Sequence, residues 1–593
     1  MKKYTKAEIV EMLSSTDRRA AYFTAEDRDR VLATPALEKR IAGIKENADK
    51  YRGKPIPTLK FSAFKLYEMT GDRTEFELAE TGYFSRRRRL LAFALLSWLY
   101  ERDEDISELE DIMWAIMDEY TWALPAHLGG RGLAELQDNG YTVDLFAAET
   151  SLALMEAVSL LEHKLSPIVV ARAKHLVKER VLDRYSCNFG WRRATHNWAA
   201  VCSGNMGMAA MYSDEDNERV ADIILVVLDS LESYLSGFAA DGACLEGLGY
   251  WSYGFGYFMC FAEMLLRRTG GGINLFDDEK VHAVATFYQK CFFEGGRIVT
   301  FSDASPSAKF SLGTVSMLSR FYDDIVIPER KYLALANEKS GCARFAFGVR
   351  NLAWATKPPS EDGTMTFGTH IFPDGQWYIS TSENGVGIAA KAGNNSEPHN
   401  HNDVGAFHIY KHGETVIADI GGGEYSSKYF NKNTRYSYFC CSSEGHSVPI
   451  IDGGTQQCGS EYAAKGTVLT ENGITADIAA AYGNESLKEL VRSIDFNRKS
   501  GVTTVSDRFV FETEPKSVVE RFITVEKPTV SDGIAKIPCG DGEAELIFDS
   551  SMLSASVREF HDTDHVAKPR VTYSIDLEIK SPSKEFCVEI IIK

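Results

Sequence analysis

The chain has 593 residues, of which 44% are hydrophobic and 25% charged. This is the composition of a globular protein and excludes a largely disordered one. At this length two or three compact units are expected rather than one domain. The formal net charge of −19 argues against a nucleic-acid partner and against binding to anionic membranes.

The N-terminus and the cysteines predict a cytoplasmic protein. Residues 1–15 read MKKYTKAEIVEMLSS, an interrupted amphipathic stretch without the apolar run of a secretory signal. No apolar run is long enough to cross a bilayer, so we expect no membrane span. The eleven cysteines lack CxxC spacing and fit reduced thiols. Composition leaves the oligomeric state open, and a homodimer is one assembly that we consider.

The sequence predicts helices from the start to about residue 352. Apolar residues recur at three- and four-residue intervals in 86–100 (RRRRLLAFALLSWLY), 150–165 (TSLALMEAVSLLEHKL) and 220–235 (VADIILVVLDSLESYL). The connecting loops are rich in glycine, aspartate and aromatic residues. Aromatic loops often form sugar-stacking surfaces, so these loops are candidates for substrate contact.

The sequence changes character after about residue 363. Short runs rich in Val, Ile, Thr, Phe and Tyr alternate with Gly, Asp, Asn and Pro turns, as in THIFPDGQWYISTS, GAFHIYKHGETVIADIGGG and SGVTTVSDRFVFETE. This pattern predicts the antiparallel strands of a sandwich, which continue through VTYSIDLEIK and FCVEIIIK to the C-terminus. We therefore predict an α-helical domain over 1–362 and an antiparallel β-sandwich over 363–593.

The densest polar cluster lies in residues 393–403, GNNSEPHNHND. On an extended segment, the alternating His399 and His401 would point to one face. Asp419 ends the run ETVIAD, and His446 lies ahead of another apolar run. His401, Asp419 and His446 could supply three ligands to a divalent metal such as zinc. An HxH pair alone is a weak signal, because hydrogen-bonded histidines explain most such pairs.

Three loops of the helical part combine aromatic residues with groups able to do chemistry. WRRATHNWAAVCSGN carries His196 and Asn197, DGACLEGLGYWSYGFGYF carries Glu246 and several tyrosines, and WAIMDEYTWALPAH carries a tryptophan and a histidine. Taken singly, each aromatic residue is more often a packing residue than a catalytic one. The candidates from the last two loops are Tyr250, Tyr253, Trp122 and His127.

Together these segments resemble the heparinase II/III superfamily of polysaccharide lyases. NNSEPHNHNDVGAFHIYKHGETVIADIGGGEY and TRYSYFCCSSEGHSVPIIDG are similar to its signature domain, and DEYTWALPAH, HNWAAVCSGN and DG-x-x-x-EG-x-GYW-x-YG to its helical motifs. The resemblance spans roughly residues 60–460, with motifs from both domains in the family's order. It implies an N-terminal (α/α) toroid, an incomplete barrel, followed by a β-sandwich.

The resemblance implies β-elimination next to the carboxylate of a hexuronic acid. This reaction needs a base at C5, an acid at the leaving oxygen and a group that neutralises the carboxylate. His399 matches the family's catalytic histidine, and Asn197 matches the neutralising position. Tyr250 is our first choice for the catalytic tyrosine, with Tyr253 close behind, and His196 is a further catalytic candidate.

The resemblance also assigns supporting roles. His401, Asp419 and His446 match the metal positions of several members, and we expect a divalent metal, zinc, in a structural role. Trp122, His127, Glu246 and Arg435 are candidates for substrate binding. For Arg435, a core or interstrand salt bridge is an equal alternative.

Two other functions remain open from the sequence. A toroid glycoside hydrolase would pair Glu246 with Asp118, Glu119 or Asp241, and a glycan-binding protein would need no catalytic set. For a lyase we expect acidic oligosaccharides as substrates. Glycosaminoglycan fragments are favoured over alginate, because alginate members usually show Asn-His where this chain has Asn197-Trp198.

Overall fold

The computed structural model describes residues 1–593 apart from 130–138, 214, 335–340, 362–366, 427 and 566. The chain forms two compact units. The helical unit comprises Met1–Gly237, Ser252–His282 and Lys309–Gly363. The β unit comprises Phe238–Trp251, Ala283–Ala308 and Thr364–Lys593.

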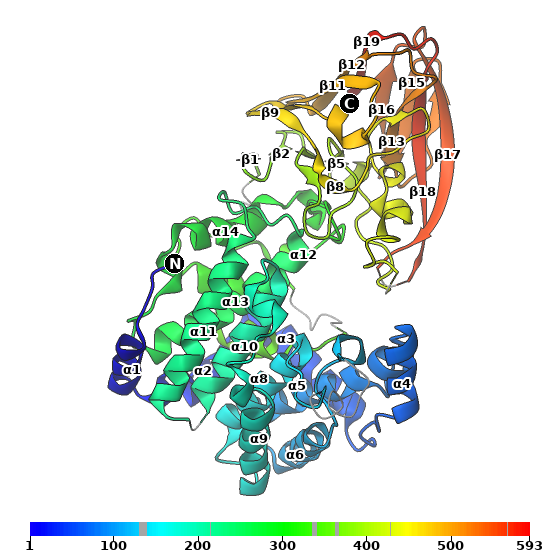
Figure 1. Ribbon diagram of the computed structural model, residues 1–593. Helices are drawn as coiled ribbons and strands as arrows, with labels where there is room; N and C mark the ends of the chain where they lie inside the picture. Colours follow the sequence, from blue (N-terminus) through cyan, green and yellow to red (C-terminus); the bar gives the residue numbers. More distant parts are fainter. Residues whose placement is uncertain (130–138, 214, 335–340, 362–366, 427, 566) are drawn as a thin grey trace. The chain divides into compact units, whose positions relative to one another are not determined.

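The helical unit consists mainly of α-helices (Figure 1), with short 3-10 or π-helical turns between some of them. Its helices are α1 (Lys6–Ser15), α2 (Ala25–Ala33), α3 (Glu38–Tyr51), α4 (Phe61–Thr70), α5 (Tyr83–Tyr100), α6 (Asp103–Met117), α8 (Leu145–Leu161), α9 (Pro167–Arg180), α10 (Asn197–Tyr212), α11 (Asn217–Ser236), α13 (Gly256–Arg268), α15 (Leu312–Leu318) and α16 (Phe345–Ala353). The three helices predicted from apolar periodicity are confirmed as α5, α8 and α11.

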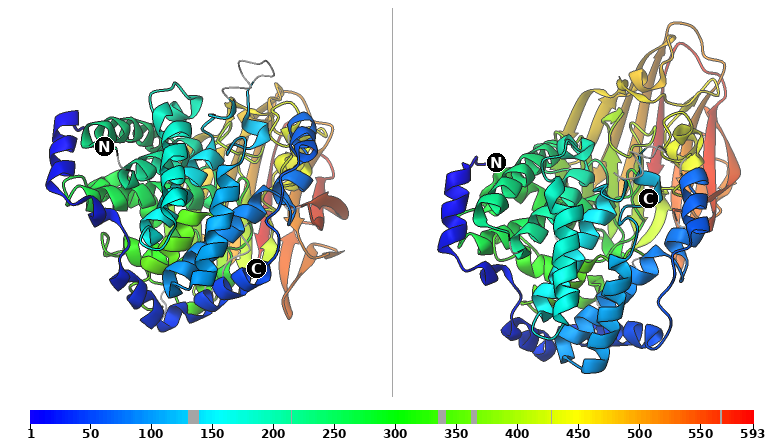
Figure 2. Two further views of the ribbon diagram at one scale, coloured as in Figure 1. Left: turned by 90° about the horizontal axis from the view of Figure 1, so that it is seen from below. Right: turned by 60° about the horizontal axis from the view of Figure 1, so that its bottom comes forward.

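Helix α10 is the central helix of this unit. It packs against α8, α11 and α13, and Figure 2 shows these cyan-to-green helices side by side. Gly207 makes the close approach to α13 possible, because a Cβ there would lie 2.5 Å from a ring carbon of Phe261. Asn197 begins α10, so the packing of this helix fixes the position of a predicted catalytic residue.

The β unit consists of antiparallel sheets. A five-stranded sheet runs β1-β2-β3-β5-β6, and the strands are β1 (Thr369–Phe372), β2 (Trp377–Thr381), β3 (Val386–Lys391), β5 (Phe407–Lys411) and β6 (Glu414–Ile417). An eight-stranded sheet runs β14 (Thr529–Ser531), β15 (Ile534–Cys539), β16 (Gly542–Phe548), β19 (Glu585–Ile592), β12 (Val502–Phe511), β11 (Leu487–Asn497), β10 (Gly473–Asp477) and β9 (Lys465–Thr470). A four-stranded sheet runs β17 (Leu553–Thr563), β18 (Pro569–Ile579), β13 (Val518–Thr524) and β7 (Ile450–Ile451), and β4 (Asn394–Asn395) pairs with β8 (Gly459–Ala463).

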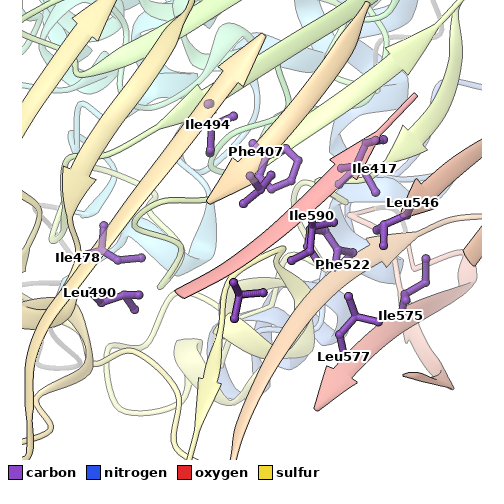
Figure 3. Packing of buried hydrophobic residues seen from close by; sticks show 14 of the residues in the cluster. Phe407, Ile417, Ile478, Leu490, Ile494, Phe522, Leu546, Ile575, Leu577 and Ile590 are labelled. Atoms are coloured by element: carbon purple, nitrogen blue, oxygen red, sulfur yellow. The ribbon is translucent and has the colours of Figure 1, made fainter. Parts of the chain in front are cut away.

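One continuous hydrophobic core joins these sheets. It includes Phe407 of the five-stranded sheet, Ile494 and Ile590 of the eight-stranded sheet, and Phe522 and Ile575 of the four-stranded sheet (Figure 3). Strands β11 and β12 alternate buried residues with partly or fully exposed ones, so each presents one face to this core. The strands predicted from composition are therefore confirmed.

Two segments that precede the strands in the sequence belong to the β unit. Residues 238–251, with the short helix α12 (Leu248–Tyr250), and residues 283–308 group with the sheets. Helix α14 (Glu279–Lys290) leads into the second segment. The predicted boundary at residues 362 and 363 lies outside the described residues. Among the helices that the structure describes, none has both the length and the hydropathy needed to cross a bilayer.

The buried His408 predicts an acid-sensitive β unit. Its ring lies among Phe293, Phe301 and Tyr410, and burial lowers its pKa from 6.5 to about 4. The folded state therefore favours the neutral ring, and the unfolded chain binds the proton first as the pH falls. We expect stability that is full above pH 6.5 and is progressively lost between pH 6.5 and about 4.

His408→Gln should flatten this pH dependence, even if it lowers stability at neutral pH. The measurement is the urea midpoint across a pH series. His561→Gln, at a histidine whose side chain is 70% exposed, is the control and should leave the slope unchanged. An unaltered slope in His408→Gln would show that other groups cause the acid sensitivity.

Candidate active site

The site in the β unit is built around the carboxylate of Asp303, whose side chain is fully buried. Its oxygen Oδ2 lies 3.0 Å from Nδ1 of His399, and Oδ1 lies 3.1 Å from Nε2 of His401. Arg435 donates from Nη2 to both oxygens, at 3.0 and 3.1 Å, and the hydroxyl of Tyr429 donates to Oδ1. Asp303 was missed in the sequence, because nothing in its local motif distinguishes it.

These partners keep Asp303 ionised. Burial alone would raise the pKa of its carboxyl. The hydrogen bonds with His399 and His401 and the nearby positive charge of Arg435 outweigh burial and hold the pKa well below its usual range. The carboxylate therefore remains an acceptor of hydrogen bonds at every pH at which the protein would be assayed.

The backbone near Asp303 is held in an unusual conformation. His399 has φ of 58° and Ser302, the residue before Asp303, has φ of 64°, both in the left-handed region that favours glycine. Residues 396–406 form turns rather than the extended segment that we predicted. His399 and His401 still reach the same carboxylate, but because of this turn rather than through strand alternation.

Tyr250 and Glu246 complete this cluster. The rings of Tyr250 and His399 stack with their centroids 4.0 Å apart, and the hydroxyls of Tyr250 and Tyr425 are 3.1 Å apart. Oε1 of Glu246 lies 3.7 Å from Nε2 of His399. The two nitrogens of the His399 ring therefore each face a carboxylate, and its flat face meets a phenol.

The surroundings of Tyr250 favour its protonated form. Burial is the largest effect, and the nearby Tyr425 and Asp303 add to it, so the pKa of the phenol is raised well above 10. At neutral pH this tyrosine has a proton to give. A buried phenol stacked on a histidine can act as a proton donor to a leaving group.

A second polar cluster adjoins the first. Ligand atoms of Asp403, Asp419 and His446 all lie within 4.8 Å of one another. The rings of His401 and His446 lie 5.1 Å apart, which brings all three predicted metal ligands into one neighbourhood. Asp419 follows β6 by two residues rather than ending it. Asp403 is an addition to the predicted set.

Several atoms of this second cluster are buried without hydrogen-bond partners among the described residues. They are Nδ1 of His401, Oδ2 of Asp403, Oδ2 of Asp419 and Nδ1 of His446. The other ring nitrogen of His446, Nε2, lies 2.8 Å from the carbonyl oxygen of Cys440 and donates to it, so in the neutral ring Nδ1 is an acceptor. Two imidazoles and one or two carboxylates suit a zinc ion.

The charges in this cluster favour binding of a cation. Burial would raise the pKa of Asp419, but the positive charge of His446, whose Nδ1 lies 3.5 Å from Oδ2, lowers it to about 2. Burial would lower the pKa of His446, but Asp419 raises it to about 9. A cation could replace the proton that this pair holds.

The remaining predicted catalytic residues lie in the helical unit. Asn197 is the first residue of α10 and is 4% exposed, and His196 is its N-cap. Asn197 packs against Gly254, where a Cβ would come within 3.0 Å of the Asn197 Cβ. Gly254 lies in the π-helical turn η7 (Trp251–Phe255), a kind of distortion that is frequent at functional sites.

Tyr253 belongs to a different cluster from Tyr250. Its hydroxyl donates to Oε1 of Glu149 at 2.6 Å, and the guanidinium of Arg344 lies 3.5 Å from its ring centroid. Arg344 also bonds to Glu149. Burial is the main reason why the pKa of Tyr253 is raised, and Arg344 opposes that shift. Glu149 and Arg344 were not predicted, because they are distant in the sequence.

The predicted sugar-binding residues differ in their exposure and in their partners. Trp122 is only 1% exposed and its indole donates to the Ile116 carbonyl, so its burial argues against contact with a sugar. The side chain of His127 is 24% exposed, with Nδ1 2.6 Å from Oδ2 of Asp144 and its ring against Trp198. Arg435 is 7% exposed and bonded to Asp303, as the salt-bridge alternative required.

Comparisons with known proteins place this fold. No protein-family model and no curated protein matches the sequence. Among solved structures, heparinase III is 12% identical, with a TM-score of 0.61 over 97% of this chain and 93% of that chain. Heparan sulfate lyase HepC from Pedobacter heparinus is 14% identical, with a TM-score of 0.60 over 96% and 87%. Chondroitin AC lyase from Streptomyces coelicolor A3, solved with chondroitin sulphate, is 10% identical, with a TM-score of 0.53 over 99% and 82%.

The chain therefore has the fold of polysaccharide lyases. The predicted fold class, an (α/α) toroid followed by an antiparallel β-sandwich, is confirmed. The resemblance that the motifs indicated is confirmed at the level of the fold.

The two interpretations of Arg435 predict different effects of its substitution on the free energy of unfolding. If its main role is to neutralise Asp303, Arg435→Met leaves a buried charge with fewer partners and should destabilise the protein by about 3–5 kcal/mol. Arg508→Met removes an arginine whose side chain is 44% exposed, and should have a much smaller effect on stability, because surface ion pairs contribute little.

Chemical denaturation, with hydrogen exchange to locate the loss in the β unit, measures both variants. Equal stability of the two variants, with weaker sugar binding only in Arg435→Met, would support the sugar-binding role instead.

Proposed function

We propose that this protein is a polysaccharide lyase that cleaves uronic-acid-containing oligosaccharides by β-elimination. The observation that carries the proposal is the stacked pair of Tyr250 and His399, fixed by Asp303, on the fold of polysaccharide lyases. An elimination requires a proton acceptor and a proton donor within reach of the substrate, and this pair offers both.

The reaction balances without a co-reactant. A base removes the proton from C5 of the uronic acid, and the electron pair forms the C4–C5 double bond. The bond from C4 to the glycosidic oxygen breaks, and an acid gives that oxygen a proton. The products are one sugar with a 4,5-unsaturated end and one with a new hydroxyl group.

The surroundings favour Tyr250 as the acid and His399 as the base. Tyr250 is protonated at neutral pH, so it can donate to the leaving oxygen. His399 can accept the C5 proton at Nε2, where Glu246, 3.7 Å away, would stabilise the resulting imidazolium. Tyr253 is the second candidate for the acid, with Glu149 and Arg344 around it.

Asn197 is proposed to neutralise the substrate carboxylate. An amide donor at that carboxylate stabilises the negative charge that develops when C5 loses its proton. Its assignment rests on the HNWAAVCSGN motif. His196 directly precedes Asn197, and we keep it as a weaker candidate for the same reaction.

A structural zinc ion is proposed at His401, Asp419 and His446, with Asp403 as a further ligand. The buried acceptor atoms of these residues that lack hydrogen bonds support this assignment. When bound, the ion would supply positive charge that holds the four side chains together. The elimination itself is assigned to Tyr250 and His399.

A glycoside hydrolase is the second candidate function, and the carboxylates give it less support. Glu119 is bound in buried ion pairs with Arg86 and Arg87. Asp118 pairs with Arg172, and Asp241 accepts backbone N–H groups of Asp374 and Gly375. Each proposed partner of Glu246 therefore has a structural role.

Glycosaminoglycan fragments are the proposed substrate class. The heparan sulfate and chondroitin AC lyases with this fold are named for such polymers. Alginate members of the family that this chain resembles usually have a histidine after the asparagine, whereas here Trp198 follows Asn197. The ring centroids of Trp198 and His127 lie 4.8 Å apart.

The direct test of the proposal is the ultraviolet absorbance of the conjugated product. Purified protein is mixed with heparan, chondroitin, hyaluronan and alginate oligosaccharides. We expect absorbance to rise with at least one glycosaminoglycan, and His399→Ala and Tyr250→Phe to lower kcat by about 100-fold or more, as is typical when an acid or base is removed.

Tyr253→Phe is the matched variant, since it removes one hydroxyl from the same loop. If Tyr250 is the acid, Tyr253→Phe keeps more activity than Tyr250→Phe, and the reverse order transfers the role to Tyr253. New reducing ends without absorbance would contradict the lyase proposal, and binding without either product would favour the glycan-binding alternative.

The metal proposal has its own test. Protein purified with zinc should hold about one equivalent per chain, and His446→Ala and Asp419→Ala should lose it. Elemental analysis and thermal stability after chelation are the readouts. His561→Ala, on an exposed strand, is the control. Retention of zinc by His446→Ala would contradict this ligand set.

A further inference from the structure

One carboxylate contacts two histidines through opposite ring nitrogens. Oδ2 of Asp303 faces Nδ1 of His399, and Oδ1 faces Nε2 of His401. An ionised carboxylate can only accept hydrogen bonds, so in each contact the histidine must be the donor. The proton of a neutral His399 therefore sits on Nδ1, and that of a neutral His401 sits on Nε2.

These tautomers leave the other nitrogen of each ring as an acceptor. In His399 that atom is Nε2, which faces Glu246 and is the atom proposed to accept the substrate proton. In His401 it is Nδ1, which is buried without a hydrogen-bond partner among the described residues and is the atom proposed to bind zinc. With the opposite tautomers, a proton would occupy Nε2 of His399 and Nδ1 of His401. Neither nitrogen could then accept the substrate proton or bind zinc.

We propose that Asp303 is a positioning residue that sets opposite tautomers on His399 and His401, and so couples the orientation of His399 to the occupancy of the zinc site. Metal-binding histidines commonly donate their second N–H to a carboxylate that orients them. Here the same carboxylate has a second oxygen, and that oxygen orients the proposed base. This inference rests on the proposed function for its catalytic consequence.

The backbone supports a positioning role for Asp303. Ser302 and His399, on the two sides of this hydrogen bond, both adopt left-handed φ values that cost free energy for a residue with a Cβ. Both are tied down: Ser302 Oγ donates to the Leu245 carbonyl at 2.9 Å, and Arg435 Nη2 donates to the His399 carbonyl at 2.8 Å. The Leu245 contact also links Asp303 to the segment that carries Glu246.

The wild-type protein provides the first test. Histidines labelled with nitrogen-15 report their tautomers through long-range couplings to the ring protons, and His399→Gln and His401→Gln assign the signals. With zinc bound, we expect Nδ1–H on His399 and Nε2–H on His401. Any other pair of tautomers would overturn the proposal, whether or not the protein has lyase activity.

Asp303→Asn is the second test, because the two histidines face different oxygens and the amide replaces one of them by an NH2 group, which donates and cannot accept. We expect at least one tautomer to change, the zinc affinity in a chelator competition to fall about 10- to 100-fold, and kcat to fall on the same order with KM preserved. Removing zinc from the wild type should broaden or shift the His399 signals, while the His561 signals stay in place.

Glu294→Gln is the matched control. It makes the same change beside His412, an exposed histidine that also has a left-handed φ of 50° and lies 3.5 Å from that carboxylate. It should leave the His399 tautomer, zinc affinity and kcat unchanged. If Asp303→Asn keeps both tautomers and the zinc affinity, Asp303 does not set them. If the tautomers change in a protein without lyase activity, the positioning role stands and the proposed function fails.

Discussion

The buried charge of Asp303 is the constraint on which the site depends. A carboxylate without water is costly unless cations and hydrogen-bond donors surround it. Asp303 obtains them from Arg435, Tyr429, His399 and His401, which come from two separate stretches of the chain. Because each of these donors must point at one place, satisfying the charge also fixes the ring that stacks on Tyr250 and the ring that borders the second cluster.

Tyr250 and Tyr253 are only three residues apart in the sequence but lie in different environments. Tyr250 belongs to the β unit and stacks on His399, whereas Tyr253 belongs to the helical unit and bonds to Glu149 beneath Arg344. Both are buried phenols, and burial raises the pKa of both. What distinguishes them is the partner at the ring face, a histidine in one case and a guanidinium in the other.

The sequence predicted what depends on local pattern. Apolar periodicity located α5, α8 and α11, because each of these helices buries one face. Residue composition between turn signals located strands such as β12, β18 and β19. The motif resemblance selected His399 and Tyr250, whose rings stack, and His401, Asp419 and His446, which lie in one neighbourhood, but not Asp403. Asp303 escaped prediction because it lies 96 residues before His399 in the chain, and only the tertiary fold brings them together. Trp122 was predicted to bind sugar, because the sequence alone does not show that its indole N–H already donates to the Ile116 carbonyl inside the protein.

The most direct test of a lyase is the mass balance of its products. An elimination breaks the glycosidic bond without adding an atom, so the masses of the two products sum to the mass of the substrate. A hydrolysis adds one water. We expect a defined glycosaminoglycan oligosaccharide, incubated with the wild-type protein, to give two fragments whose masses sum to that of the intact chain. A sum larger by one water would contradict the elimination and with it the roles assigned to Tyr250 and His399.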